Sequence, residues 1–542
     1  MRTMESSAEL LWGGLSVENK YEPSRHHCLR TVSRTSMFPV LLFAGSFLLF
    51  LLLFRRRKAH LPYPPTPPGL PVLGNWSDVR CEQVRDRYHE LAKRYGEIFH
   101  LTMLGHHVVV INSIDVAEEL FNRRSHIYSS RLDYPMANLM GWGLIAATFL
   151  PYGNLWRAQR RLYQHGFNAD AVRELSYPIL TEKINGFLHN LLTTPDDFVH
   201  HTEMMLGAVI FKFVYGRDLD VNASSKDPIF EAAAQSVRNL IASILPGSFL
   251  VNTIPVLQRL PEWFPGCYFQ RFARETLALT MEVFHGGYAQ ALQDMEGDSL
   301  VKKLEEYKSK NVDTDTEVAK GVCAVSYAGA ADNTRTIMST FFLLMREHPE
   351  VQRRAYEEIV YVCGMNKLPE FSDRAALPYV QAVYLEVMRW MPVLPLSLPH
   401  ATSEDDVYRG YFIPKGSSVI GNMWTMLNDE EKYPNPRTFQ PERFLAHDGK
   451  LMSNTDVKSI LAYGFGRRVC PGRHFGDAVL WRAMACILAA FVIGKEQDGP
   501  PETMEQLEAG FDQGIMAFPP AFKCTIKPRT SEMADVIRSQ TL

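Results

Sequence analysis

Apolar residues recur every three to four positions through most of residues 72–542, which is the pattern of amphipathic helices. The longest such run covers about residues 314–346 and is apolar on most faces, so we predict a central helix of roughly 50 Å. Two short runs, HHVVVIN at 106–112 and SSVIGNMW at 417–424, predict strands. The pattern therefore predicts a single, mainly helical domain over residues 72–542.

A different pattern precedes this domain. Residues 37–54 (MFPVLLFAGSFLLFLLLF) form a run of 18 residues without a charge, and four cations follow at 55–58. That length is close to what a bilayer-spanning helix needs, and trailing cations hold the following chain on the cytoplasmic side. We expect a transmembrane anchor rather than a cleaved signal peptide, because the run lies behind a long leader and no small-residue cleavage site follows it.

Residues 55–71 join the anchor to the domain. They begin with the cations and continue with six prolines between Pro62 and Pro71, which predicts a stiff, extended linker. Residues 1–36 carry mixed charge without a clear period, and Met37 is a candidate alternative to Met1 as the start of translation. The status of residues 1–36 therefore stays open.

Composition and charge narrow the function. The chain of 542 residues is 46% hydrophobic and 22% charged, with a net charge of -3, so no broad basic surface for nucleic acid is expected. The eight cysteines show no paired metal-ligand spacing, which suits a reducing compartment without disulfides.

One cysteine has unusual neighbours. Cys470 lies within AYGFGRRVCPGRHFG, residues 462–476, among glycines and arginines. Pro471 suits the first position of a helix, and a helix start favours negative charge, here a thiolate. The glycines allow close approach of a flat group, and Arg468 can neutralise a carboxylate on it. These features predict a thiolate ligand for a metal in a haem, although a glycine-rich turn around an inert cysteine is the alternative.

The stretch YGFGRRVCPG resembles the FxxGxRxCxG signature of the cytochrome P-450 family of haem-thiolate monooxygenases, with Tyr463 at the leading phenylalanine. The resemblance implies a mainly α fold with a small β-rich lobe, preceded here by one transmembrane helix. It also implies that Cys470 is the axial ligand of haem b iron and that Arg468 pairs with a haem propionate.

Further motifs of that family follow in order. Glu386 and Arg389 resemble the ExxR pair, which in the family locks with an arginine such as Arg443 in FQPERF. Three other ExxR spacings occur, so position in the chain selects this one. Trp156 and Arg160 resemble the WxxxR pair that contacts a propionate, although a surface pair is the common alternative.

His400, in LSLPHAT, stands where family members often carry an arginine or histidine for the other propionate. A structural histidine is the alternative.

The predicted long helix contains YAGAADNTRT, residues 327–336, which resembles the oxygen-binding stretch [AG]GxDT[TS] of the family. The resemblance implies that Asp332 supplies protons for dioxygen reduction. Asn333 replaces the threonine whose hydroxyl, in the family, helps route those protons. An amide with water can serve instead, but coupling of dioxygen to product is expected to be weaker or helped by a substrate hydroxyl.

The resemblance implies a monooxygenase that uses dioxygen and electrons from a separate NADPH-cytochrome reductase, with Arg467 and Arg473 available to steer that partner. The substrate is expected to be hydrophobic (a terpenoid, polyketide or lipid), because apolar segments line the expected pocket: 127–149, 201–260, 392–399 and 514–522. The sequence most resembles filamentous-fungal members of secondary metabolism. With the anchor, this predicts a single-pass protein of the endoplasmic reticulum whose catalytic domain faces the cytoplasm.

Two alternatives remain at this level. Asn333 is compatible with a haem-thiolate isomerase, dehydratase or peroxygenase that needs no reductase. A non-catalytic haem-binding membrane protein is the third hypothesis, and it predicts no spin change on adding substrate.

Overall fold

The computed structural model divides the chain into two units, Met1–His60 and Leu61–Leu542. It describes Gly45, Phe47 and residues 61–219, 227–245, 248–293, 297–311, 315–453, 455, 460–496 and 502–540. The predicted anchor at 37–54 thus lies outside the described residues, except for Gly45 and Phe47. None of the helices within the described ranges is long and apolar enough to cross a membrane.

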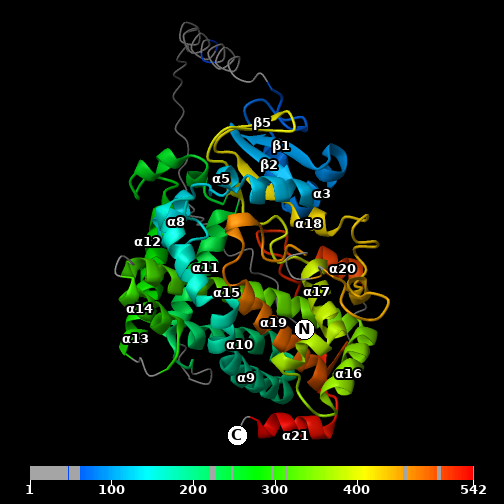
Figure 1. Cartoon of the computed structure of the whole chain (residues 1–542). Helices are drawn as coiled ribbons and strands as arrows, with labels where there is room; N and C mark the ends of the chain where they lie inside the picture. Colours follow the sequence, from blue (N-terminus) through cyan, green and yellow to red (C-terminus); the bar gives the residue numbers. More distant parts are fainter. Residues whose placement is uncertain are drawn as a thin grey trace, which may run out of the picture. The chain divides into compact units, whose positions relative to one another are not determined.

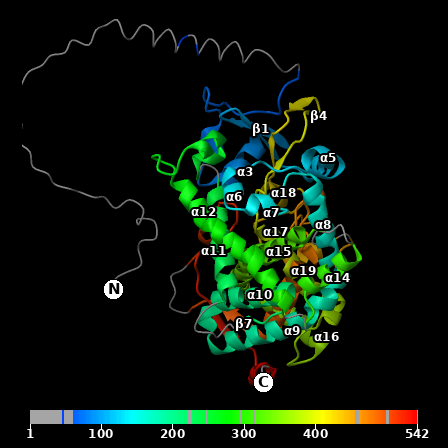
Figure 2. The same ribbon diagram turned by 90° about the vertical axis from the view of Figure 1, so that its left-hand side faces the viewer.

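Helices form most of the second unit, as predicted (Figure 1). The long central helix is α15, Thr316–Glu347, and Asp315 caps its start by accepting a hydrogen bond from the N–H of Glu317. It packs against α10 (Phe198–Tyr215), α8 (Asn154–Gly166) and α19 (Arg473–Ala490). Figure 2 shows α15 from a second side, again running between other helices.

The remaining helices surround these four. They are α2 (Trp76–Val79), α3 (Val84–Tyr95), α4 (Ile114–Ala117), α5 (Ser125–Tyr128), α6 (Pro135–Leu139), α7 (Trp142–Ile145), α9 (Ala169–Thr193), α11 (Pro228–Ile244), α12 (Tyr268–Met281), α13 (Gly287–Gln293), α14 (Leu300–Lys310), α16 (Pro349–Cys363), α17 (Pro378–Trp390), α18 (Met423–Leu427), α20 (Met504–Ala509) and α21 (Ser531–Ser539). Single-turn π segments follow α4 and α12, at Glu118–Arg123 and Glu282–Gly286.

The small β-rich part combines distant segments of the chain. A four-stranded sheet has the order β1-β2-β6-β3, from Ile98–Met103, His106–Ile111, Ser418–Gly421 and His400–Ala401. Only the β2–β6 pair is parallel in this sheet. The described residues form two further antiparallel pairs: β4 (Asp406–Tyr408) with β5 (Tyr411–Ile413), and β7 (Phe491–Gly494) with β8 (Thr525–Pro528).

The strand predicted at 417–424 is shorter in the structure. It ends at Gly421, because the Asn422 side chain accepts a hydrogen bond from the N–H of Thr425 and so caps α18. The apolar residues after Gly421 belong to that helix, which a short apolar run cannot distinguish from a strand.

A buried ion cluster joins α17 to the 3-10 turn Pro441–Phe444, which precedes Cys470 in the chain. Arg389 donates to both carboxylate oxygens of Glu386, at 2.6 and 2.9 Å, and both side chains are fully buried. Arg443 donates to the same carboxylate at 3.1 Å, as its motif predicts. Arg389 also donates to the backbone carbonyls of Leu427 and Pro436, so further hydrogen bonds support the buried ion pair.

Candidate active site

Cys470 lies in the loop between a 3-10 turn, Gly466–Arg468, and α19. Burial raises the pKa of its thiol, while the N–H of Gly472 and the guanidiniums of Arg160 and Arg473 lower it. The helix begins at Arg473 and not at Pro471 as predicted, because Gly472 occupies the N-cap position. The amide that stabilises a thiolate here is therefore the one at the cap.

Free space adjoins the loop. The side chain of Cys470 is half-buried. A Cβ added at Gly464 or at Gly329 of α15 would meet no atom within 4 Å. Gly466 differs, because it has a φ of 53° and a Cβ there would collide with the carbonyl of Phe121. Its role is a tight turn against that carbonyl rather than space for a flat group.

Three arginines lie near this loop, and all their hydrogen bonds go to backbone carbonyls. Arg468 donates to Ser129, Ala147 and Leu150, each at 2.7 Å. Arg160 donates to Val469 at 2.8 Å. Arg131 donates to Thr148 at 3.0 Å, to Pro399 at 2.7 Å and, more closely, to Leu398. None of the three forms an ion pair with a carboxylate among the residues that the structure describes.

The pKa values of all three arginines are lowered. Burial, followed by the charges of Arg131 and Arg160, lowers the pKa of Arg468 to about 8. Burial lowers the pKa of Arg131 to about 10 and also lowers the pKa of Arg160. Three partly buried cations without an anion among the described residues cost free energy, and a ligand with carboxylates would offset it. Arg131 was not predicted from the sequence, because it lies in the mixed polar and apolar stretch SSRLDY and no motif marks it.

The other predicted propionate residues lie beside these cations. The Trp156 ring lies 4.8 Å from the guanidinium carbon of Arg468 and 5.8 Å from that of Arg160, on the same helix α8. His400 is buried, and its Nδ1 lies 2.7 Å from the carbonyl oxygen of Tyr128. Burial, with Arg131 and Arg468 nearby, holds the pKa of His400 well below its usual value, so the ring is neutral.

Asp332 and Asn333 lie on α15, and they contact neither Cys470 nor the arginines just described. The Asp332 carboxylate accepts from Arg335 at 3.2 Å. Asn333 donates from Nδ2 to the carbonyl of Gly329 at 3.0 Å, while its Oδ1 is buried without a partner among the described residues. Helix α15 packs against α8 and α19, and a Cβ added at Gly329, one turn before Asn333, would meet no atom within 4 Å.

This donor set fits a haem. A thiolate provides a soft metal ligand, two open glycines leave room for a flat group, and the unpaired cations match two carboxylates. We therefore assign Cys470 to iron and Arg468, Arg160, Arg131 and His400 to the propionate side, as the residues that would hold the group.

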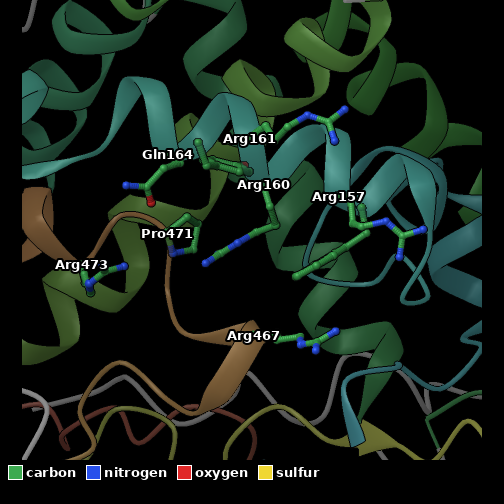
Figure 3. Close-up of a pocket in the computed structure, with 9 residues that line it drawn as sticks. Arg157, Arg160, Arg161, Gln164, Arg467, Pro471 and Arg473 are labelled. Carbon is green, nitrogen blue, oxygen red and sulfur yellow. The ribbon is translucent and has the colours of Figure 1, made fainter. Parts of the chain in front are cut away.

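A basic pocket lies on the outer side of the same loop (Figure 3). It has a volume of about 400 Å³. Arginines from α8 and from the cysteine loop face each other across it, with Pro471 at its edge. The arginines that line it are Arg157, Arg160, Arg161, Arg467 and Arg473.

Known proteins resemble this chain over most of its length. The sequence profile of the cytochrome P-450 family matches residues 64–520. The chain is 36% identical to cytochrome P-450 monooxygenase 98 of Postia placenta, over 90% of this chain and 94% of that protein. It is 35% identical to cytochrome P-450 monooxygenase ppsD of Aspergillus oryzae and 34% identical to cytochrome P-450 monooxygenase ple1 of Rhodocybe pseudopiperita, in each case over 90% of this chain and 92% of the relative. The chain belongs to the cytochrome P-450 family of monooxygenases, whose cofactor is a haem with an axial cysteine thiolate.

Proposed function

We propose that this enzyme hydroxylates a hydrophobic small molecule, using dioxygen and electrons from an NADPH-dependent cytochrome reductase. The observation that carries the proposal is Cys470, which lies beside open space and is flanked by partly buried cations without a carboxylate partner among the described residues. When bound, a haem held by a thiolate supplies the activation of dioxygen that such a reaction needs.

The chain's own residues have separate roles in this proposal. Arg160, Arg468 and the neutral His400 orient the carboxylates of the cofactor, and Trp156 supports the two arginines. Asp332 holds and passes protons. Asn333 stabilises the backbone of α15 by donating to Gly329 and leaves its carbonyl oxygen for a water or a substrate hydroxyl.

The proposed electron donor docks at the basic pocket. Its five arginines lie next to the loop that carries the thiolate, and the pocket is lined by no carboxylate. Such a surface attracts an acidic partner at long range. Replacing Arg467 and Arg473 together is therefore expected to weaken reductase binding.

Apolar side chains from distant segments support a hydrophobic substrate. Several side chains are partly buried around one apolar cluster and come from the N-cap of α6, from α7, from α15 and from the segment after α20: Tyr134, Ile145, Val325, Ala328 and Ile515. A terpenoid, polyketide or lipid suits such a lining. We assign the reaction to secondary metabolism because of the sequence's resemblance to fungal members with that role.

We also propose a single-pass anchor at residues 37–54 that holds the catalytic domain on the cytoplasmic side of the endoplasmic reticulum. Exposed apolar side chains in the segment 250–268 support a position near lipid, since large exposed apolar patches mark interaction sites. They are Leu250, Ile254, Val256, Trp263, Phe264 and Tyr268.

The decisive test is a carbon-monoxide difference spectrum of the reduced protein. Wild type is expected to show the thiolate-type Soret band, and Cys470→Ser is expected to lose it because the hydroxyl is a poor substitute for the thiolate. Cys81→Ser, at another half-buried cysteine, is the matched control and keeps the band. A wild-type band that persists in Cys470→Ser would contradict the ligand assignment.

Asn333 keeps one alternative open, an isomerase, dehydratase or peroxygenase that needs no reductase. The unpartnered Oδ1 favours it, because an amide does not relay protons as a hydroxyl does. Product formation without NADPH and reductase would support the alternative, and strict dependence on both would exclude it.

A further inference from the structure

Phe121 lies between the cysteine loop and one of the residues assigned to the propionate side. It belongs to the π turn Glu118–Arg123 and is almost fully buried. Its ring stacks on that of Phe465 in the cysteine loop, with the ring centres 5.0 Å apart and the ring planes at 28°. The centre of the same ring lies 4.4 Å from the centre of the His400 ring. Phe121 therefore contacts both parts of the chain that would hold the haem.

The backbone of the π turn also packs against the cysteine loop. Gly466 follows Phe465 with a φ of 53°, and a Cβ at this glycine would collide with the carbonyl of Phe121. The N–H of Arg468 then donates to the carbonyl of Phe465 at 3.1 Å, which closes the 3-10 turn. The contact with Phe121 is thus made at the start of the turn that leads to Cys470.

One carboxylate, that of Asp406 at the start of β4, connects the π turn with the segment of His400. Arg124 directly follows the π turn and donates from Nη1 to both oxygens of this carboxylate, at 3.0 and 2.9 Å. The hydroxyl of Tyr128 donates to the same carboxylate at 2.8 Å. The carbonyl oxygen of Tyr128 lies 2.7 Å from Nδ1 of His400. Phe121 and His400 consequently share one anchor in the β-rich part of the fold.

The rings of Phe121 and Phe465 are also confined by the sheet. A Cβ added at Gly421, the last residue of β6, would lie 2.7 Å from Cε2 of Phe465 and 3.4 Å from Cε2 of Phe121. The ring pair thus fills the space between the sheet and the cysteine loop. Loss of either ring would leave a cavity, and the loop could shift to fill part of it.

We propose that Phe121 is a positioning residue that keeps the loop of Cys470 in the place where its thiolate meets the iron. Phe121 acts through Phe465 and Gly466 and does not itself touch the metal or the substrate. An anionic ligand stabilises ferric iron more than ferrous iron, because the ferric ion carries the higher charge. A loop that moves away weakens this preference, so the iron becomes easier to reduce.

The inference goes beyond the proposed function. It needs only the haem-thiolate cofactor of the family, and it does not depend on which molecule the enzyme oxidises.

The test is an equilibrium redox titration of the substrate-free holoenzyme, followed by its absorption spectrum. Phe121→Leu is expected to raise the ratio of ferrous to ferric protein at a given electrode potential about threefold, the size of an aromatic pair interaction. This corresponds to a rise in reduction potential of about 28 mV, at about 59 mV per tenfold for one electron.

Phe99→Leu is the matched control. Phe99 is fully buried on β1 of the same sheet, and its ring packs edge-on against Tyr88 with the ring centres 5.9 Å apart. It does not belong to the buried cluster that contains Phe121 and Phe465. This variant is expected to lose stability without a change in reduction potential.

The carbon-monoxide band of the reduced protein gives a second readout. On mild warming, Phe121→Leu is expected to lose the thiolate-type band severalfold faster than Phe99→Leu, because a loosely held thiolate is displaced or protonated more easily. A merely structural role would give equal rates in the two variants once their free energies of unfolding are matched with urea.

A double-mutant cycle tests the ring contact itself. Phe465→Leu removes the same ring pair from the side of the loop and is expected to raise the reduction potential in the same direction. Together with Phe121→Leu, it should shift the potential no further than the larger of the two single shifts. Additive shifts would overturn the proposal, because the two rings would then act independently.

An unchanged potential in Phe121→Leu, with a free energy of unfolding lowered as in Phe99→Leu, would also overturn the proposal. If Phe121→Leu does not fold, as judged by the loss of haem absorption, Phe465→Leu compared with Phe99→Leu decides the question. A wild-type protein that shows no thiolate-type band would instead contradict the assignment of Cys470 to iron, on which the proposed function depends.

Discussion

At the scale of single residues, the three arginines without an acidic partner are the clearest sign of what this protein binds. Arg131, Arg160 and Arg468 give their hydrogens to backbone carbonyls, which satisfies hydrogen bonds but leaves the positive charges uncompensated. Arg160 and Arg468 were predicted from their motifs. Arg131 was not, because its proximity to the others depends on how the loop after α5 folds over the site.

Asn333→Thr is the residue-scale prediction. A hydroxyl both donates and accepts a proton, so the threonine is expected to restore the relay that the amide interrupts. Hydrogen peroxide released per NADPH should fall severalfold, and product per NADPH should rise.

The matched control is Thr334→Asn, which changes the next residue of α15. Equal peroxide yields in wild type and Asn333→Thr would show that Asn333 does not limit coupling.

At the scale of elements, the β1–β2 hairpin is held to the proline-rich linker by a pair of histidines. His100 Nε2 lies 2.9 Å from His107 Nδ1, and His100 Nδ1 lies 3.1 Å from the hydroxyl of Thr66. The ring of Tyr63 stacks on His100 at 4.8 Å. Both histidines are therefore placed as neutral rings between the sheet and the linker.

This arrangement predicts a loss of stability in acid. Burial, followed by the charge of His107, lowers the pKa of His100 to about 4. Because the folded-state pKa lies below the unfolded one of about 6.5, the unfolded chain binds the proton first and stability falls as pH drops from 6.5 toward 4. Between pH 7 and pH 5 the loss through His100 is about 2 kcal/mol.

The measurement is the free energy of unfolding in urea at pH 7 and pH 5. His100→Gln is expected to lose most of this pH-dependent part, while His126→Gln, at an exposed position, is expected to retain it. The same pH dependence in wild type and His100→Gln would exclude His100 as its source.

At the scale of the whole molecule, segments far apart in sequence build each part of the site. The Glu386–Arg389–Arg443 cluster fixes α17 against the loop before Cys470, and removing one partner of such a buried cluster typically costs 3–5 kcal/mol. Strand β6 joins the N-terminal hairpin to the segment that carries His400. The catalytic unit thus depends on long-range contacts throughout Leu61–Leu542.

Removal of residues 1–60 is the prediction at this scale. If 37–54 anchors the chain, the truncated protein should move from the membrane fraction to the supernatant after ultracentrifugation. It should retain the thiolate–carbon-monoxide band, because the site residues all follow residue 60. Full-length protein in the supernatant, or truncated protein that stays in the membrane fraction, would argue against a single anchor.

The sequence by itself determined the helical class, the position of α15 and the family, because apolar periodicity and short motifs are local properties. It also led to the proposal of most of the site residues. Helical spacing puts Trp156 with Arg160, and Glu386 with Arg389, on one helix face, and the order of the motifs along the chain selects these pairs. Tertiary structure decided what depends on packing: the start of α19 at Arg473, the end of β6 at Gly421, and the cations gathered without an anion. It also decided that Phe121 contacts both His400 and Phe465, since the three residues lie far apart in the chain and no spacing in the sequence links them.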